Sequence, residues 1–417
     1  MFSLLNIRIG WFLAVRQLRR ASLWTTGLIV FVMVLTFLNL VVVSGILVGL
    51  IQGSIDAERT QYTSDIIISK LNDKKYIENS PNIIALARSL PGVLAVSPRY
   101  TDGALLEANY KTKRQTDKAN TAVGQAVGIN PADENAVTHL GSHVIEGAYL
   151  SPGDYDQVVI GDFLLKQYVP IDRAGFESLD AVFVGTKIRI TVEGVTREVT
   201  IKGILKSKVQ DISRNVYMVD SQLRSMIGRD DGNVGEVAVK LSPGADPLVL
   251  KNQLLLRGLG DVAKVQTYAD AQPQFLKDIV ATFGMLGTAF SSIGLVVASI
   301  TIFIVVFINA ITRRKFIGIL KGIGIDGHAV EIAYVLQSIF YALCGSSIGL
   351  LIVYGFLAPT IAAHPIDFPF SDGILVAPVG QTLWRVGLLV FSTVVAGFVP
   401  AWMIIRKNTL DSILGRN

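Results

Sequence analysis

The sequence has few of the residues that build disulfides and metal sites. Among its 417 residues there are one cysteine, Cys344, and four histidines. A lone cysteine excludes disulfides within the chain and zinc sites made of several thiolates. His139 and His143 are four positions apart, but no cysteine or carboxylate lies close by in the sequence to complete a metal site. We interpret them as a surface pair and predict no metal site.

Glycine-rich nucleotide loops are also missing. No GxxxxGK[ST] pattern occurs, which excludes ATP binding by a P-loop in this chain. Gly322, Gly324 and Gly327 form a GxGxxG pattern, but it lies in a basic link rather than between a strand and a helix, so a dinucleotide site is not expected. No Ser-His-Asp arrangement or carboxylate pair stands out. We therefore predict no catalytic residue, no bound cofactor and no enzymatic activity for the chain itself.

Charged residues make up only 17% of the chain, whereas 51% of residues are hydrophobic. The apolar residues gather in four runs, at residues 24–51, 283–310, 332–358 and 383–405. Each run is long enough to cross the bilayer, because a helix of about 20 apolar residues spans about 30 Å of hydrocarbon. We predict a membrane α-helical protein with four transmembrane helices. Since these runs lack ionisable residues in their interiors, a proton- or sodium-coupled carrier is disfavoured.

Basic residues predict the orientation. They are concentrated in residues 1–23, in the link at 311–331 and in the tail at 406–417, whereas the link at 359–382 has Asp367 and Asp372 and no lysine or arginine. The positive-inside rule therefore places both termini in the cytoplasm and residues 52–282 outside it. The net charge of +5 mostly reflects these anchoring residues, so nucleic acid is not expected as a partner. Residues 5–20 predict an amphipathic helix on membrane lipids with Trp11 as its anchor; a frayed basic tail is the alternative.

Residues 52–282 alternate strand-like and helix-like runs, which predicts a large mixed α+β extracytoplasmic domain between the first two transmembrane helices. Strands are expected at residues 65–69, 93–96, 157–160 and 234–241, and helices at 82–89 and 247–256. Residues 187–205 predict a hairpin with Glu193 and Gly194 at its turn. We also expect a subdivision around residues 142–152, and helical stalks at 52–61 and 271–282.

Small residues repeat every four positions in two of the apolar runs. Gly45, Gly49 and Gly53 follow this spacing at the end of the first run, and Gly345 and Gly349 follow it in the third. Such spacing lets another helix approach closely. We predict that the first set forms a contact between two copies or related permeases.

The link between the second and third runs reads TRRKFIGILKGIGI at residues 312–325. Ile317, Leu320, Ile323 and Gly324 can form one apolar face of a short amphipathic helix. Basic residues lie beside this face: Arg313, Arg314 and Lys321. A helix of this kind under the membrane is suited to docking a cytosolic partner. The alternative is a simple turn whose charges follow the positive-inside rule.

The layout and this link resemble the FtsX-like (MacB-type) permease family, the membrane subunits of type VII ABC transporters. In that family the link reads approximately RRxEIGILRALGA. The residues that match here are Arg313, Arg314, Ile317, Gly318, Ile319, Leu320, Lys321 and Gly324. A weaker match is Pro400-Ala401 in the fourth run, with Ile413-Leu414 in the tail. Two positions depart from the pattern, since Phe316 replaces a common glutamate and Leu410 stands where a proline often follows.

The resemblance implies an ATPase-coupling site formed by the link, including Phe316, and a separate ABC ATPase subunit that binds the ATP. It further implies a second permease, as a homodimer or a related paralogue, an optional periplasmic adaptor protein, and a location in the bacterial cytoplasmic (inner) membrane. The implied function is mechanotransmission, in which ATP hydrolysis moves the outer domain and an amphiphilic cargo (a lipid, lipoprotein, peptide or drug) is exported or extracted. The alternative is a transmembrane regulator of the same family that activates a cell-wall hydrolase or relays a signal without transport.

Overall fold

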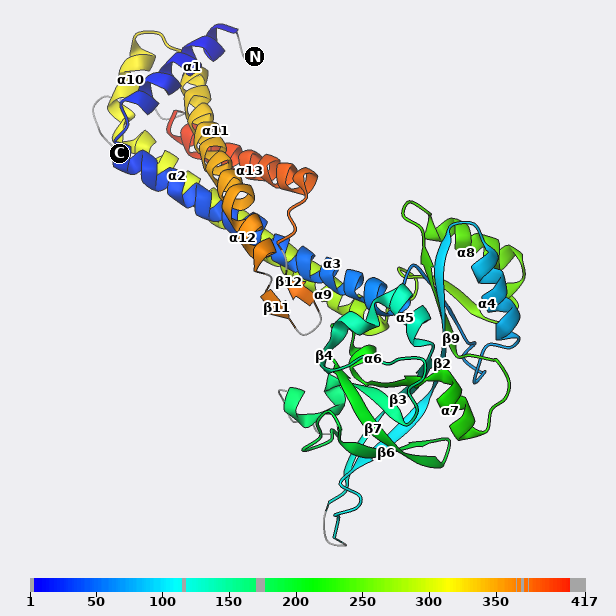
Figure 1. The fold of residues 1–417 in the computed structure, drawn as a ribbon. Coiled ribbons are helices and arrows are strands. Elements are labelled where there is room, and N and C mark those ends of the chain that lie inside the picture. Colours follow the sequence, from blue (N-terminus) through cyan, green and yellow to red (C-terminus); the bar gives the residue numbers. More distant parts are fainter. Residues whose placement is uncertain are drawn as a thin grey trace. The chain divides into compact units, whose positions relative to one another are not determined.

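The computed structural model describes residues 4–114, 118–169, 177–364, 366–368, 371–373 and 375–405. The chain divides into two compact units, which Figure 1 draws as a helical part and a part built around a sheet. The membrane unit comprises residues 1–51, 278–367 and 372–417. The outer unit comprises residues 52–277 and 368–371.

Within the described residues, four helical segments are long and apolar enough to cross a membrane, at Leu23–Thr63, Leu276–Thr312, Gly327–Ala363 and Val379–Met403. The first consists of α2 (Leu23–Leu38) and α3 (Ser44–Glu58), with π-helical turns at Asn39–Val43 and Arg59–Thr63. The second is α9 (Gln274–Thr312), the third is α11 (Gly327–Ile352) with α12 (Ala358–Ala363), and the fourth is α13 (Val379–Ile405). The predicted four transmembrane helices are confirmed.

Helix α11 packs closely against α2 because it presents glycine at the contact. A Cβ added at Gly349 would overlap the ring of Phe37, and one added at Gly345 would overlap Met33. Phe37 and Met33 are fully buried. The small-residue spacing in this run thus serves close helix packing within the chain, as it does in many membrane helices.

Gly45 is packed against residues of the same chain. A Cβ there would lie 2.7 Å from Leu375 Cδ1, and Val376 N–H donates to the Gly45 carbonyl over 3.2 Å. Gly49 is buried and Gly53 is half-buried. Contact with a second copy through Gly45, Gly49 and Gly53 remains a prediction.

An amphipathic helix, α1 (Leu4–Arg19), precedes the first transmembrane helix. Its buried face consists of Asn6, Gly10 and Ala14, whereas Trp11 and Phe12 are exposed. A large apolar side chain left exposed beside arginines suits the interface between lipid and water. The predicted helix is therefore present, and its contact with lipid remains a prediction.

The outer unit contains a four-stranded antiparallel sheet in the order β10 (Lys264–Thr267), β1 (Ile66–Ser69), β9 (Glu236–Leu241) and β2 (Val93–Ala108). Helix α4 (Ser80–Ser89) connects β1 to β2, and α8 (Pro247–Leu256) connects β9 to β10. This is the βαββαβ order of the ferredoxin-like motif. Both helices share one hydrophobic core with the sheet, at Ile66, Ile83, Val239 and Leu254.

Between β2 and β9 the chain forms a closed ring of strands. Its order is β2, β3 (Asn120–Ile129), β8 (Asn215–Val219), β5 (Gln157–Gly161), β7 (Val195–Leu205) and β6 (Lys187–Val192), and β6 pairs again with β2. Strand β4 (Val144–Gly147) adds to β7. Alternate residues of these strands fill the interior, among them Leu106, Ile160, Ile190 and Ile201. Closure removes the exposed strand edges that would otherwise be open to pairing.

The remaining elements cover the ring or connect strands. They are α5 (Pro131–Thr138), α6 (Gln210–Ser213) and α7 (Asp220–Ile227). Between α12 and α13 the short strands β11 (Ile366–Phe368) and β12 (Ser371–Gly373) form a separate two-stranded sheet. The predicted hairpin at 187–205 is present, and Glu193 and Gly194 both have positive φ, as a two-residue type I′ turn requires. The expected subdivision around residues 142–152 is wrong. Strands β4 and β5 on either side of it both pair with β7, and the unit instead divides where β2 passes from sheet to ring.

Candidate docking site at the α10–α11 corner

Helix α10 (Arg314–Gly322) follows α9 after a single non-helical residue, Arg313. It ends in a Schellman motif, in which Ile325 N–H donates to the Leu320 carbonyl over 3.0 Å and Gly324 N–H donates to the Lys321 carbonyl over 3.1 Å. Gly324 has φ +92°, which explains why glycine occupies this position. The motif gives the short helix a defined end directly before α11.

Asp326 caps the start of α11. Its Oδ1 accepts hydrogen bonds from His328 N–H over 3.1 Å and pairs with His328 Nδ1 at 3.0 Å. Its Oδ2 accepts a bond of 2.7 Å from Asn6 Nδ2 in α1. The bonds from His328 and Asn6 hold the pKa of Asp326 at about 2. One carboxylate thus joins α1 to the corner between α10 and α11.

Helix α1 lies directly on α11 beyond this bond. A Cβ at Gly10 would be 2.7 Å from Ile332 Cγ2, so only glycine leaves room for this approach. Further along the pair, Gln337 Nε2 donates to Gln17 Oε1. Contacts at both ends make α1 a brace along the first turns of α11.

The residues that α10 buries and exposes are not the ones that the sequence pattern predicts. Ile317 is only 5% exposed and packs into the core of the membrane unit, and Gly318 beside it is also buried. Phe316, Ile319 and Ile323 are 69%, 51% and 71% exposed. They follow the spacing i, i+3, i+7, so they lie on one side of the helix and its end. We call these three residues the exposed stripe.

The expected grouping of Ile317, Leu320, Ile323 and Gly324 is therefore wrong for Ile317. Its side chain holds α10 to the bundle, whereas Leu320 and Lys321 are half-buried and Gly324 is exposed. Arg313 is half-buried, and the side chain of Arg314 lies outside the described residues. Sequence reasoning also missed Asn6 and Asp326. An aspartate before a helical run is an N-cap signal that could have found the second.

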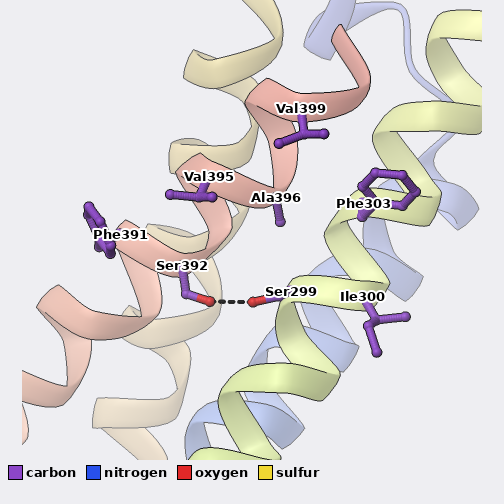
Figure 2. A pocket seen from close by; sticks show the side chains of 8 residues that line it. All are labelled: Ser299, Ile300, Phe303, Phe391, Ser392, Val395, Ala396 and Val399. Carbon is purple, nitrogen blue, oxygen red and sulfur yellow. Dashed lines mark hydrogen bonds between the residues drawn. The ribbon is translucent and has the colours of Figure 1, made fainter. Parts of the chain in front are cut away.

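A groove of about 450 Å³ lies between α9 and α13 of the membrane unit. Figure 2 shows the hydroxyls of Ser299 and Ser392 bonded to each other across it, with Phe391 and Ile300 among the apolar residues that line it. The hydroxyl pair satisfies two polar groups in a groove whose other lining residues are apolar. The groove carries no ionisable residue among those that line it.

The two histidines that lie four positions apart do not form a site in the structure. His139 ends α5 in a left-handed conformation, so it does not share a helical face with His143, and its Nε2 lies 2.9 Å from Lys240 Nζ. Among the residues that the structure describes, no group of three metal-ligating side chains occurs. Pro400 lies inside α13 and Ala401 is buried, whereas Leu410 and Ile413-Leu414 lie outside the described residues.

Comparison with known families decides what the membrane unit is. Residues 288–409 match the family described as FtsX-like permease C-terminal, a stretch that contains most of α9 and all of α10, α11, α12 and α13. This part of the chain is an FtsX-like permease domain. The predicted resemblance is confirmed, and the corner between α10 and α11 lies inside the matched stretch.

Relatives of the FtsX-like permease domain are found among named transporters. An uncharacterized ABC transporter permease of Methanocaldococcus jannaschii is 22% identical over 224 residues, which cover 51% of this chain and 54% of the relative. The macrolide export ATP-binding/permease protein MacB of Bdellovibrio bacteriovorus is 28% identical over 128 residues, which cover 31% of this chain and 19% of MacB. The chain thus spans about half or less of the length of these relatives.

Two solved structures are similar to part of the chain. The periplasmic region of MacB from Actinobacillus actinomycetemcomitans has 16% identity and a TM-score of 0.35, covering 50% of this chain and 90% of that one. The extracellular domain of the noncanonic ABC-type transporter YknZ from Gram-positive bacteria has 14% identity and a TM-score of 0.31, covering 48% of this chain and 98% of that one.

Proposed function

We propose that the chain is the permease subunit of an ABC transporter and that a separate ATPase docks on the exposed stripe. The observation that carries this proposal is an apolar surface on a short helix, within a basic link, inside an FtsX-like permease domain. An amphipathic helix that offers apolar anchors to a groove is a recurring mode of protein recognition. Because the sequence contains no P-loop, ATP binding is assigned to the partner.

The chemistry of the stripe suggests which partner surface it fits. Phe316 projects from the first turn of α10 and Ile323 from its end. Both would bury apolar area on an ATPase, at about 25 cal/mol per Å² removed from water. Lys315 is exposed next to Phe316. The proposed partner therefore presents an apolar cleft with an acidic rim.

Movement would pass from the corner into the long helices. The brace formed by α1, through Asn6 and Asp326, would make α10 and the start of α11 move together. Both α3 and α9 continue as single helices from the membrane unit into the outer unit. We infer that the outer unit acts on an amphiphilic cargo outside the cytoplasmic (inner) membrane, with a second permease as the pairing partner. An adaptor protein is an additional expected partner.

The test is co-purification of the full chain with its ATPase from native membranes in a mild detergent, followed by ATPase assays. Phe316→Asp and Ile319→Asp should each lower recovery of the ATPase at least about tenfold, since an apolar anchor lost from a buried contact costs 1.4 kcal/mol or more. Gly322→Ala is the matched control, because a Cβ there meets nothing within 4 Å.

A stoichiometric P-loop ATPase that is lost with Phe316→Asp and kept with Gly322→Ala would support the proposal. Recovery that is unchanged in both stripe variants would remove the docking site. An ATPase that binds normally while a cell-wall hydrolase, and no cargo, responds to ATP would replace transport with the regulatory function.

A further inference from the structure

Arg385 places a positive charge on the packed side of a transmembrane helix. It lies near the start of α13 and is half-buried. Thr382, three positions before it, and Leu389, four positions after it, are both buried. Residues at these offsets share one side of a helix. The side chain of Arg385 therefore starts from the face of α13 that packs into the membrane unit.

The guanidinium of Arg385 has a buried nitrogen without a partner. Within the described residues, no hydrogen-bond acceptor meets its Nη1. The hydroxyls of Tyr354 and Thr382 lie 3.0 Å apart and donate to the carbonyls of Ala377 and Pro378 over 2.8 and 3.1 Å. These polar groups are thus already bonded to other atoms. An uncompensated charge in a transmembrane helix is costly, so its position calls for an anionic partner.

The start of α13 also carries a residue typical of the lipid headgroup region. Trp384, next to Arg385, is 68% exposed. Tryptophan is enriched at the boundary between lipid and water, where its ring sits at the level of the headgroups. Phosphate is the anion found at that level, and a guanidinium matches its geometry through two parallel hydrogen bonds.

The apolar groove between α9 and α13 continues from this point along the same side of α13. Ser392 and Ala396, which line it, are seven and eleven positions after Arg385 and so lie below it on one side of the helix. The nearer of the two is about 10 Å further along, at about 1.5 Å per residue. The groove measures about 450 Å³, within the usual range of ligand pockets of about 300–1,000 Å³.

The lining of the groove offers an occupant almost only apolar contacts. The hydroxyls of Ser299 and Ser392 bond to each other, as Figure 2 shows, and the remaining lining residues are apolar. Phe391 and Val395 are 69% and 47% exposed beside them. A charged group followed by an apolar groove is the order of polarity that a lipid has from its headgroup to its acyl chain.

We propose that this side of α13 binds a phosphate-bearing lipid, with the phosphate at Arg385 and an acyl chain in the groove. A transmembrane helix of a second copy fits less well. None of the four apolar runs contains an aspartate or glutamate, so such a helix would cover the groove and leave Arg385 unpaired. The inference concerns the membrane unit alone and does not rest on the proposed ATPase.

The experiment measures the midpoint of thermal unfolding of the full chain in dodecyl maltoside micelles at increasing mole fractions of dioleoyl phosphatidic acid. A ligand that binds the folded chain raises this midpoint as its concentration rises above the dissociation constant. Dioleoylglycerol, which has the same chains without the phosphate, tests the groove alone. Inorganic phosphate tests Arg385 alone. The wild type should respond to phosphatidic acid at a mole fraction at least about tenfold lower than to dioleoylglycerol, because the phosphate adds a charge-assisted pair.

Two variants separate the two parts of the site. Arg385→Gln should need at least about tenfold more phosphatidic acid for the same rise in midpoint, and its response to dioleoylglycerol should not change. Val395→Phe fills the groove from an exposed position and should weaken the response to both lipids. Arg19→Gln is the control, because Arg19 is an exposed arginine at the end of α1, and it should respond as the wild type does.

Equal responses of the wild type to phosphatidic acid and dioleoylglycerol, or an unchanged response of Arg385→Gln to phosphatidic acid, would overturn the proposal. Inorganic phosphate as effective as phosphatidic acid would overturn it in favour of a simple anion site. If Arg385→Gln does not fold, Val395→Phe provides the decision, since an unchanged response of that variant also contradicts the site. Absence of any lipid effect, with a dimer that dissociates in Val395→Phe by light scattering, would assign the groove to a second copy instead.

Discussion

Asn6 and Asp326 are 320 positions apart in the chain and are joined by a hydrogen bond of 2.7 Å from Asn6 Nδ2 to Asp326 Oδ2. The carboxylate that accepts this bond also caps α11 through His328 N–H. A single side chain therefore fixes both the direction in which α11 begins and the position of α1 against it. The corner between α10 and α11, which carries the exposed stripe, is thus held by a residue of α1, far away in the sequence.

Replacement of Asp326 by alanine should destabilise the corner by about 1–3 kcal/mol, because both the N-cap and the bond from Asn6 are lost. Hydrogen exchange in α1 and in the first turn of α11 should speed up together. Asp326→Asn is the control, since asparagine also caps helices well and keeps an acceptor for Asn6. Faster exchange in α11 alone would show that the bond to α1 contributes nothing.

Replacement of Gly349 by alanine should destabilise the membrane unit by about 1–3 kcal/mol, because the added Cβ overlaps the buried ring of Phe37. The midpoint of thermal unfolding in detergent would measure this loss. Gly355→Ala in the same transmembrane segment is the matched control, since a Cβ there meets nothing within 4 Å. Equal midpoints for the two variants would contradict close packing of α11 on α2.

Replacement of Arg99 by methionine should destabilise the outer unit by about 3–5 kcal/mol, because Glu134 is left as an uncompensated buried charge. The double variant Arg99→Met with Glu134→Leu should recover most of this loss, which thermal unfolding of the full chain would detect. A double variant no more stable than Arg99→Met would show that lost packing, rather than the unpaired charge, dominates.

The same pair predicts a response to acid. The pKa of Glu134 is lowered in the folded state, so its contribution to stability is present above the ordinary carboxyl range and is lost as pH falls through its folded value. The wild type should therefore lose stability in acid more steeply than the double variant that lacks both charges. Parallel stability curves on acidification would contradict this prediction.

Replacement of Gly194 by alanine should cost about 1 kcal/mol, because φ is +81° at this turn position and a Cβ is strained there. Gly103→Ala is the control, since Gly103 lies in β2 without a positive φ and a Cβ there meets nothing within 4 Å. A shift of the thermal midpoint in both variants would indicate a general effect of losing glycine rather than the turn.

Much of the fold could be predicted from local sequence. The transmembrane helices follow from apolar runs of sufficient length, and the hairpin at 187–205 follows from alternation around Glu193 and Gly194. Strand β2 was predicted only at residues 93–96, although it extends from Val93 to Ala108. Its second half contains Gly103 and polar residues, and it is held as a strand by β3 and β6, which lie far away in the sequence.

The candidate site was predicted in position but not in detail. The basic link and its glycine were visible, and the exposure of Phe316 fits the expected docking role. The burial of Ile317 was not visible, because periodicity gives a face of a helix but not the direction in which the bundle lies. The bond from Asn6 to Asp326 could not be predicted, because nothing in the sequence around Asn6 indicates a partner in the link.

The sequence by itself determined the number of transmembrane helices and the hairpin turn, because apolar length and glycine conformation act over a few residues. Only the tertiary structure decided three further features: which residues of α10 face outward, that β6 closes a ring on β2, and that Arg99 lies between Glu134 and Glu236. Each of these depends on residues brought together from distant segments, whose distances no local pattern encodes.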